Sequence, residues 1–304
     1  MKACFLRRYG SPEVLEYGEL PDPAPGAGEV LIEIHAASVN AADWKMRAGQ
    51  YGAAVSFPHV PGRDFSGVIA RGGRDFKAGD AVFGVCEVPR EGAYAERIAI
   101  REAIVARKPE RLSHVQTAAI ALAGLTAVVS LEETLQLKRG ETILIQGGAG
   151  GVAGFAIALA KHLGARVITT ASAQNHDYVR KLGADEVIDY RAQDFTKLLK
   201  DVDAVFDTVG GDVTTRSFAV LKSGGRLASI AVGGAAPASP RPDVKSLRPK
   251  VDRDRRRLDR VAQLVAQGAV PLPEIMEYPL AKAAEAHRVS EARHLRGKLV
   301  LRAR

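Results

Sequence analysis

The feature that most constrains the fold is a strand pattern that runs directly into a glycine-rich turn. Residues 142–146 (TILIQ) are apolar and β-prone, and residues 147–154 (GGAGGVAG) follow at once. Read as G-x-G-x-x-A, this segment places Gly148, Gly150 and Ala153 at the three positions that need small side chains. Those positions make the tight turn, let backbone N–H groups approach a pyrophosphate, and pack the helix against the strand. A strand before the turn and a helix after it favour a dinucleotide-binding loop over a ligand-free glycine turn.

The chain around this loop alternates between strand and helix patterns. Ser113 is a plausible helix N-cap, and the Lys138-Arg139-Gly140 triplet is a plausible helix stop. Such alternation predicts a parallel sheet with helices on both faces, which is a doubly wound Rossmann sheet. We expect helices over 116–122, 126–137, 151–163, 177–182, 195–200 and 212–221, and strands over 142–145, 166–170, 186–189, 204–207 and 226–230.

The first hundred residues show a different pattern, with strand signals and few helix signals. Short alternating segments bounded by glycine or charged turns predict strands over 29–35, 67–70, 81–85 and 95–100. Strands at this spacing are typical of a barrel-like β unit. Near the C-terminus we expect a loop over 233–242, helices over 257–266 and 279–290, and a final strand over 298–301.

The end of the second Rossmann strand indicates which cofactor the loop would bind. A site selective for NAD has Asp or Glu there, on the ribose hydroxyls, and no carboxylate occurs between Val167 and His176. The polar residues available are Ser172, Gln174, Asn175 and His176, which can hydrogen-bond a 2′-phosphate. The sequence therefore favours NADPH. Ser172 as a simple helix cap is an alternative compatible with phosphate binding.

Composition excludes several other classes of protein. The formal net charge is +8, but the densest basic run, residues 253–257, leads into an amphipathic helix and has no interleaved aromatic residues. We therefore expect no nucleic-acid partner. The chain has no run of about 18 apolar residues and its first eight residues do not resemble a signal peptide, so we expect no membrane association and a cytoplasmic location. Its two cysteines cannot form a four-cysteine zinc site.

Several segments together resemble the zinc-free quinone oxidoreductase (zeta-crystallin-like) branch of the medium-chain dehydrogenase/reductases. The resemblance spans nearly the whole chain. It rests on residues 38–45 (SVNAADWK), 58–67 (PHVPGRDFSG), the glycine loop with 161–165 (KHLGA), 182–190 (LGADEVIDY), 206–211 (FDTVGG) and 297–301 (GKLVL).

The resemblance implies an α/β fold in which a GroES-like β-rich catalytic domain carries an inserted Rossmann domain. The implied boundaries are 1–115 plus 268–304 for the catalytic domain and 116–267 for the NADP(H)-binding domain. It also implies a homodimer, an active site in the cleft between the domains, and transfer of hydride from NADPH to a quinone or an α,β-unsaturated carbonyl. An enoyl-thioester reductase, and an NADPH-binding structural or sensor protein without turnover, remain as alternatives.

The resemblance also bears on zinc. Zinc-dependent relatives carry a cysteine where this chain has Asn40, a histidine where it has Arg63, and a third ligand near Leu122. Asparagine, arginine and leucine cannot form a Cys/His zinc site, so no metal is expected. Arg63 and Asp64 are interpreted as a scaffold pair, and Asp43 as structural.

Carried over residue by residue, the resemblance names the candidate site. Asn40 would lie beside the nicotinamide and the substrate, and Lys45, where a tyrosine often stands, could donate to the developing enolate oxygen. Tyr51 is a candidate pocket wall or proton donor, with an ordinary loop aromatic as the alternative. The candidate cofactor-binding residues are Asn40, Thr126, Gly148, Gly150, Gly151, Val152, Ser172, Asn175, Tyr190, Val209 and Val232.

Overall fold

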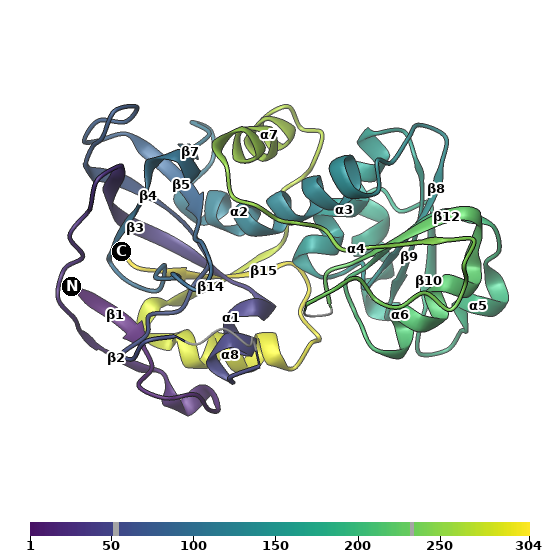
Figure 1. The fold of residues 1–304 in the computed structure, drawn as a ribbon, viewed down its shortest axis with the longest axis horizontal. Coiled ribbons are helices and arrows are strands. Elements are labelled where there is room, and N and C mark those ends of the chain that lie inside the picture. The colour runs from purple at the N-terminus through teal and green to yellow at the C-terminus, as the bar shows by residue number, and fades with distance from the viewer. Residues whose placement is uncertain (51–54, 232–233) are drawn as a thin grey trace. The chain divides into compact units, whose positions relative to one another are not determined.

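The structure, a computed structural model, describes residues 1–50, 55–231 and 234–304 (Figure 1). Contacts divide the chain into two compact units. Unit 1 comprises Met1–Leu122, Arg253–Ala266 and Glu274–Arg304, and unit 2 comprises Ala123–Asp252 and Gln267–Pro273. Unit 2 is thus an insertion within unit 1, and the chain enters it a second time over Gln267–Pro273 before it ends in unit 1.

Unit 2 is built on a parallel six-stranded sheet in the order β10-β9-β8-β11-β12-β13. This is the strand order of a Rossmann sheet, so the predicted fold of this part is confirmed. The order reverses between β8 and β11, where Gln146 pairs with Asp207 at the carboxyl ends of the two strands. The strands are β8 (Thr142–Gln146), β9 (Arg166–Ala171), β10 (Glu186–Asp189), β11 (Val202–Asp207), β12 (Leu221–Ser229) and β13 (Lys245–Leu247).

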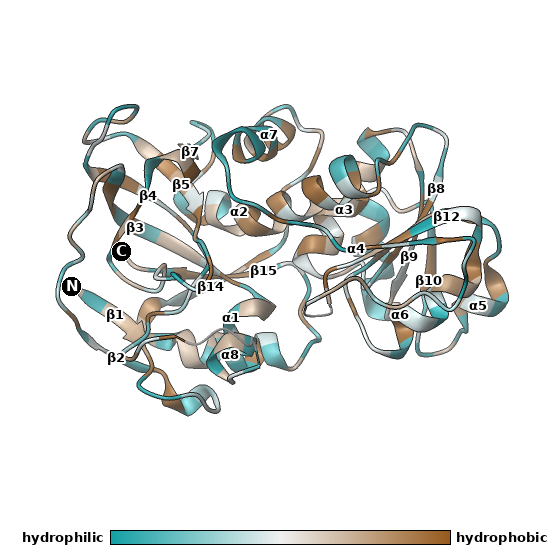
Figure 2. Cartoon of the chain, in the orientation of Figure 1, coloured by the Kyte–Doolittle hydropathy of each residue, from teal (hydrophilic) through white to brown (hydrophobic). Residues whose placement is uncertain are grey.

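The helices of unit 2 follow the strands as predicted, with ends that differ by a few residues. They are α3 (Gly151–His162), α4 (His176–Lys181), α5 (Phe195–Leu198) and α6 (Asp212–Ser217). Apolar residues dominate α3 (Figure 2), and every residue from Ala153 to Ala160 is buried. This burial anchors the helix whose first turn carries the glycine loop.

The two helices expected over 116–122 and 126–137 form one continuous helix instead. α2 (His114–Val128) runs directly into a π-helical segment, η3 (Val129–Thr134). Ser113 caps it as predicted, since the Gln116 N–H donates to Ser113 Oγ at 3.1 Å. A glycine inside a helix costs only about 1 kcal/mol, and burial of its apolar neighbours outweighs that cost.

The merged helix has the length and composition of a membrane span, a feature the sequence argument did not find. It runs over His114–Thr134, and 83% of its most apolar window is buried inside the protein. Burial of this kind is what the core helix of a globular protein shows, and no other helix in the described part of the chain is long and apolar enough to cross a membrane.

Unit 1 is rich in β structure, as predicted. Its main sheet has the order β14-β15-β3-β4-β5-β7, with β6 paired to β3, and a separate pair joins β1 to β2. The strands are β1 (Lys2–Phe5), β2 (Glu16–Glu19), β3 (Glu29–Val39), β4 (Asp64–Arg71), β5 (Ala81–Val85), β6 (Arg97–Arg101), β7 (Val105–Arg107), β14 (Ile275–Pro279) and β15 (Lys298–Arg302). Two helices, α1 (Ala41–Arg47) and α8 (Ala283–Glu291), pack against each other.

The predicted boundary at residue 267 is wrong for one element. Helix α7 (Arg255–Ala266), assigned from sequence to the Rossmann domain, belongs to unit 1 and packs on β7. Residues 116–122 also fall in unit 1.

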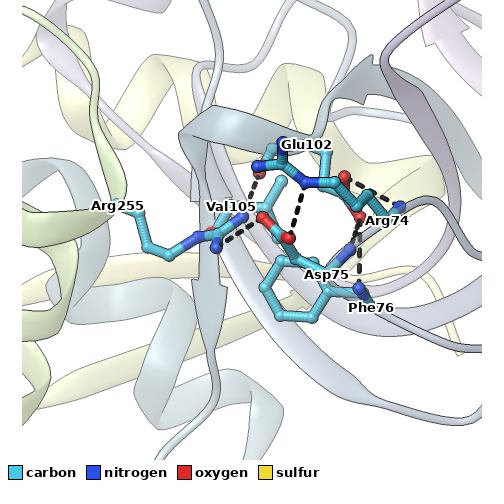
Figure 3. Close-up of polar contacts among 6 residues, drawn as sticks. All are labelled: Arg74, Asp75, Phe76, Glu102, Val105 and Arg255. Carbon is cyan, nitrogen blue, oxygen red and sulfur yellow. Dashed lines mark hydrogen bonds and ion pairs between the residues drawn. The ribbon is translucent and has the colours of Figure 1, made fainter.

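The reason is the first residue of α7 (Figure 3). The Arg255 guanidinium donates to the carbonyl oxygens of Val105 and Glu102 at 2.9 and 3.0 Å. It also forms an ion pair with Asp75 at 2.9 Å and lies 4.8 Å from the centroid of the Phe76 ring. A planar guanidinium uses both its donor fork and its face here, so Arg255 fixes the start of α7 to unit 1.

Candidate active and cofactor site

The glycine loop lies at the carboxyl end of β8 and opens α3. Gly150 is the N-cap of α3, with extended backbone angles. The first intrahelical bond runs from Gly154 N to Gly150 O at 2.7 Å. The N–H groups of Gly151 and Val152 therefore have no partner within the helix. Such a helix start binds anions, because N–H groups and the helix dipole both point at the ligand.

The glycines of the loop meet different demands. Gly147, one residue before the predicted turn glycine, adopts a φ of 77°. At Gly148 a Cβ would lie 2.2 Å from Thr169 Oγ1, which packing forbids. A Cβ on Gly150 would meet only Gly147 O, at 3.5 Å. Internal packing therefore requires glycine at 148, whereas the lack of a side chain at Gly150 leaves the backbone open to a ligand.

The end of β9 carries the polar pair predicted to face a 2′-phosphate. Ser172 and Asn175 are both buried, and Asn175 Nδ2 donates to Ser172 Oγ at 3.2 Å. The Ser172 hydroxyl keeps its own proton for another acceptor. The structure brings these two residues to the same edge of the sheet as the glycine loop, because parallel strands place their carboxyl ends together.

Tyr190 and Val209 follow the next two strands of this edge and are large apolar residues with exposed side chains, at 51% and 45%. Asp207, the buried last residue of β11, fixes the loop that contains Val209, because its carboxylate accepts from Val209 N and Gly210 N at 2.9 and 3.1 Å. Exposed apolar side chains at such an edge suit the flat face of a nucleotide base. Thr126 is buried in α2, and Val232 lies outside the described residues.

In unit 1 the centre of the candidate site is Asn40, between β3 and α1. It is 9% exposed, and both ends of its amide are engaged. Its Nδ2 donates to Asp64 Oδ1 at 3.1 Å, and its Oδ1 accepts from Lys298 Nζ at 2.7 Å. The amide orientation is therefore fixed by a carboxylate on one side and an ammonium on the other.

Lys298 and Asp64 are buried charges that the sequence argument did not connect with Asn40. Lys298 Nζ also donates to Val39 O at 3.0 Å, and Asp64 accepts from Ser38 Oγ and Leu122 N at 2.8 and 3.0 Å. Burial lowers the pKa of Lys298 and raises the pKa of Asp64, and their mutual attraction opposes both shifts. Each charge thus depends on the other for its ionised form.

A second buried network joins α1 to α8. Asp43 accepts from Asn40 N at 2.8 Å and from Tyr94 Oη at 3.0 Å, and Tyr94 Oη lies 3.2 Å from His287 Nε2. Burial raises the pKa of Asp43 to about 7 and lowers the pKa of His287 to about 3. Asp43 therefore holds the N-terminus of α1, in line with its interpretation as structural.

Arg63 and Asp64, interpreted from sequence as a scaffold pair, bond different residues in the structure. Arg63 Nη2 donates to Glu91 Oε1 at 3.2 Å, whereas Asp64 serves Asn40, Ser38 and Leu122. The two side chains support unit 1 separately.

Two positions that hold zinc ligands in metal-dependent relatives, Asn40 and Leu122, meet at Asp64, but the residues at all three positions do not fit a metal. Asn40 Oδ1 is taken by an ammonium, Arg63 carries a positive charge, and Leu122 offers only its backbone N–H to Asp64. Among residues 1–50, 55–231 and 234–304, no group of three His, Cys, Asp or Glu side chains could hold a metal ion. No step of the chemistry is assigned to zinc.

The remaining candidate, Lys45, is half-buried on α1. Its Nζ lies 5.7 Å from the centroid of the neighbouring Trp44 ring. Tyr51 lies outside the described residues. Lys45 therefore keeps its predicted role as a hypothesis, on the same helix that begins at Asn40.

Comparison with known proteins gives two family matches. Residues 26–110 match the family described as alcohol dehydrogenase GroES-like domain, and residues 182–301 match the family described as zinc-binding dehydrogenase. The second description contains a metal that the residues around Asn40 do not fit.

Individual relatives agree on an oxidoreductase. A chloroplastic quinone-oxidoreductase QR1 of Triphysaria versicolor is 30% identical over 99% of this chain and 98% of its own length. A 2-methylene-furan-3-one reductase of Solanum lycopersicum is 38% identical over 75% of this chain. That match covers 61% of the tomato protein. An NADPH-dependent alkenal/one oxidoreductase of Arabidopsis thaliana is 36% identical, and the match covers 62% of its length. The chain thus spans less than two thirds of these two relatives.

Solved structures cover the chain from end to end. The quinone oxidoreductase of Coxiella burnetii has a TM-score of 0.93 and 34% identity, and covers 100% of this chain and 99% of its own. The quinone oxidoreductase of Escherichia coli, solved in complex with NADPH, has a TM-score of 0.89 and 30% identity, and covers 99% of this chain and 100% of its own.

Proposed function

The chain belongs to the zinc-free medium-chain dehydrogenase/reductase family, and from this we propose that it is an NADPH-dependent reductase of quinones or α,β-unsaturated carbonyls. The observation that carries the proposal is the edge of the unit 2 sheet. There a helix start able to bind a pyrophosphate lies beside a strand end that has Ser172 and Asn175 in place of a carboxylate.

The residues present fit NADPH. The N–H groups of Gly151 and Val152 would bind the pyrophosphate, and Ser172 with Asn175 would bind the 2′-phosphate. Tyr190 and Val209 would pack against the nucleotide. When bound, NADPH supplies a hydride to an electron-poor carbon of the acceptor.

Asn40 contributes position rather than a proton. Its amide is held by Lys298 and Asp64, so it offers a rigid wall beside the substrate instead of a titrating group. The oxygen that gains charge on reduction then needs a donor, and Lys45 is the described candidate. In an enone the α-carbon takes its proton from water or from a side chain.

The experiment is a rate measurement of NADPH oxidation by the purified protein. The acceptors are a quinone, a 2-enal, an enone and an enoyl-CoA, with NADH as the control cofactor. Turnover of the quinone, enal or enone with NADPH, and slower turnover with NADH, is expected. Turnover of the enoyl-CoA alone would instead identify an enoyl-thioester reductase. Tight NADPH binding without turnover of any acceptor would refute the enzyme proposal and favour a sensor.

Two further properties are proposed, a dimer from the family resemblance and a location from the sequence pattern. We propose that the protein forms a homodimer, which light scattering on a size-exclusion column would test. We also propose a cytoplasmic location, which fractionation of the source cells would test.

A further inference from the structure

Gln146, the last residue of β8, is a buried polar residue that the proposed function does not use. Its side chain is 1% exposed, and both ends of its amide are bonded. Oε1 accepts from Thr170 Oγ1 at 2.7 Å, and Nε2 donates to Ser217 Oγ at 3.1 Å. A buried amide with both ends bonded has one orientation.

Through Thr170, this amide reaches the glycine loop. The Thr170 hydroxyl accepts from Gly147 N at 3.1 Å, and the Thr170 carbonyl accepts from Gly148 N at 2.9 Å. A hydroxyl has one proton. Because that proton is directed at Gln146 Oε1, the oxygen lone pairs of Thr170 face Gly147. The orientation of Gln146 therefore fixes the direction of the Thr170 hydroxyl that accepts from the first glycine of the loop.

The main chain of Gln146 reaches the loop after β11. Its carbonyl accepts from Thr208 Oγ1 at 2.8 Å. The two loops pack closely, because a Cβ on Gly147 would lie 3.0 Å from both Thr208 Oγ1 and Val209 Cγ2. Gln146 Nε2, through Ser217, fixes the helix α6 that follows this second loop.

We propose that Gln146 is a positioning residue for NADPH, which holds the glycine loop, the end of β9 and the Val209 loop in the arrangement that binds the dinucleotide. These are the three segments to which cofactor binding is assigned above, so the inference rests on the proposed function. Gln146 touches no ligand itself; it acts through Thr170, Thr208 and Ser217.

The test is the dissociation constant of NADPH, measured by calorimetry without any acceptor. Gln146→Met keeps the side-chain length and removes both amide bonds, and we expect the Kd to rise about tenfold, which is ~1.4 kcal/mol. Thr170→Val is isosteric and removes the hydroxyl that holds Gly147. It should raise the Kd by a similar factor, and the double variant should add little to either single change.

A matched control is Asp203 of β11, which bonds the other end of β8. Asp203 Oδ2 accepts from Thr142 N at 2.8 Å, so Asp203→Ala removes a bond that anchors the start of β8. This control should lower the thermal unfolding temperature and leave the Kd within about twofold of the unchanged protein, because no step connects it to the loops.

The outcomes separate the two proposals. If the unchanged protein binds no NADPH, the proposed function fails. If it binds NADPH and both Gln146→Met and Thr170→Val leave the Kd unchanged, or the control raises it equally, the role of Gln146 is refuted. Should Gln146→Met fail to fold, the Kd of Thr170→Val decides by the same criterion.

Discussion

The network of Asp43, Tyr94 and His287 predicts two opposing contributions to the pH dependence of the free energy of unfolding of unit 1. Burial raises the pKa of Asp43 to about 7, against about 4 in an unfolded chain. The folded state then binds more protons than the unfolded state between these values. Asp43 therefore stabilises the fold most below about pH 4, and the contribution is lost as the pH rises toward 7.

His287 has the opposite sign. Burial lowers its pKa to about 3, against about 6.5 unfolded, so the unfolded state binds more protons in this range. Its contribution is complete above about pH 6.5 and is lost as the pH falls toward 3. Each group alone gives a slope of up to about 1.4 kcal/mol per pH unit. Between about pH 4 and 6.5 the two slopes cancel.

Single substitutions should expose each slope. Asp43→Asn keeps an acceptor for Asn40 N and Tyr94 Oη, and the free energy of unfolding should then rise with pH across this window. His287→Gln keeps a donor for Tyr94 Oη, and its free energy of unfolding should instead fall with pH relative to that of the unchanged protein. The curves should diverge by up to about 2.7 kcal/mol per pH unit, twice the slope of one group.

The assay is urea unfolding at several pH values, followed by the fluorescence of the single tryptophan. That residue, Trp44, is buried on α1, so its emission reports on unit 1. The profile of the unchanged protein should lie between those of the two variants. Parallel profiles for the two variants would refute the reasoning, because equal slopes would mean that neither group titrates abnormally in the fold.

Three other substitutions test single features of the structure. Lys298→Met leaves a buried carboxylate without its counter-charge and should lower the free energy of unfolding by about 3–5 kcal/mol in urea titration, and a loss below 1 kcal/mol would contradict it. Gly148→Ala places a methyl group 2.2 Å from Thr169 Oγ1, and calorimetry should show at least tenfold weaker NADPH binding in a folded protein. Ser172→Asp should reverse the preference from NADPH to NADH in the rate assay, and an unchanged ratio would exclude this strand end from the phosphate site.

Much of unit 2 could be predicted from the sequence because its signals are local. A strand, a glycine turn and a helix follow one another within residues 142–162, and the alternation of strands and helices predicts a parallel sheet. Predictions failed where tertiary contacts outweigh local pattern. Separate helices were expected over 116–122 and 126–137, yet one helix continues through Gly124 because its neighbours are buried. Arg255 belongs to the basic run that leads into α7, and the local pattern gave no sign that it would be bonded to Glu102, Val105 and Asp75.

The candidate site shows the same division between residues with local sequence signals and residues placed by tertiary contacts. The glycine loop, Ser172 and Asn175 are candidates that the motif and the strand position name from the sequence alone. Lys298 escaped notice because it lies 258 residues from Asn40 in the chain. The one available signal was a lysine at the head of an otherwise apolar strand (KLVLR), where a charge needs a partner.

The bonds of Asn40 also explain why replacing this one residue by cysteine would not create a metal site in this chain. An amide can donate to Asp64 and accept from Lys298 at the same time, which a cysteine thiolate cannot do. Cysteine at position 40 would leave Asp64 without its amide donor and would not displace the ammonium, which is also bonded to Val39 O. Arginine at 63 and leucine at 122 would supply no further ligand. Asn40 and Lys298 are therefore one unit, and the metal-free character of this region depends on both together.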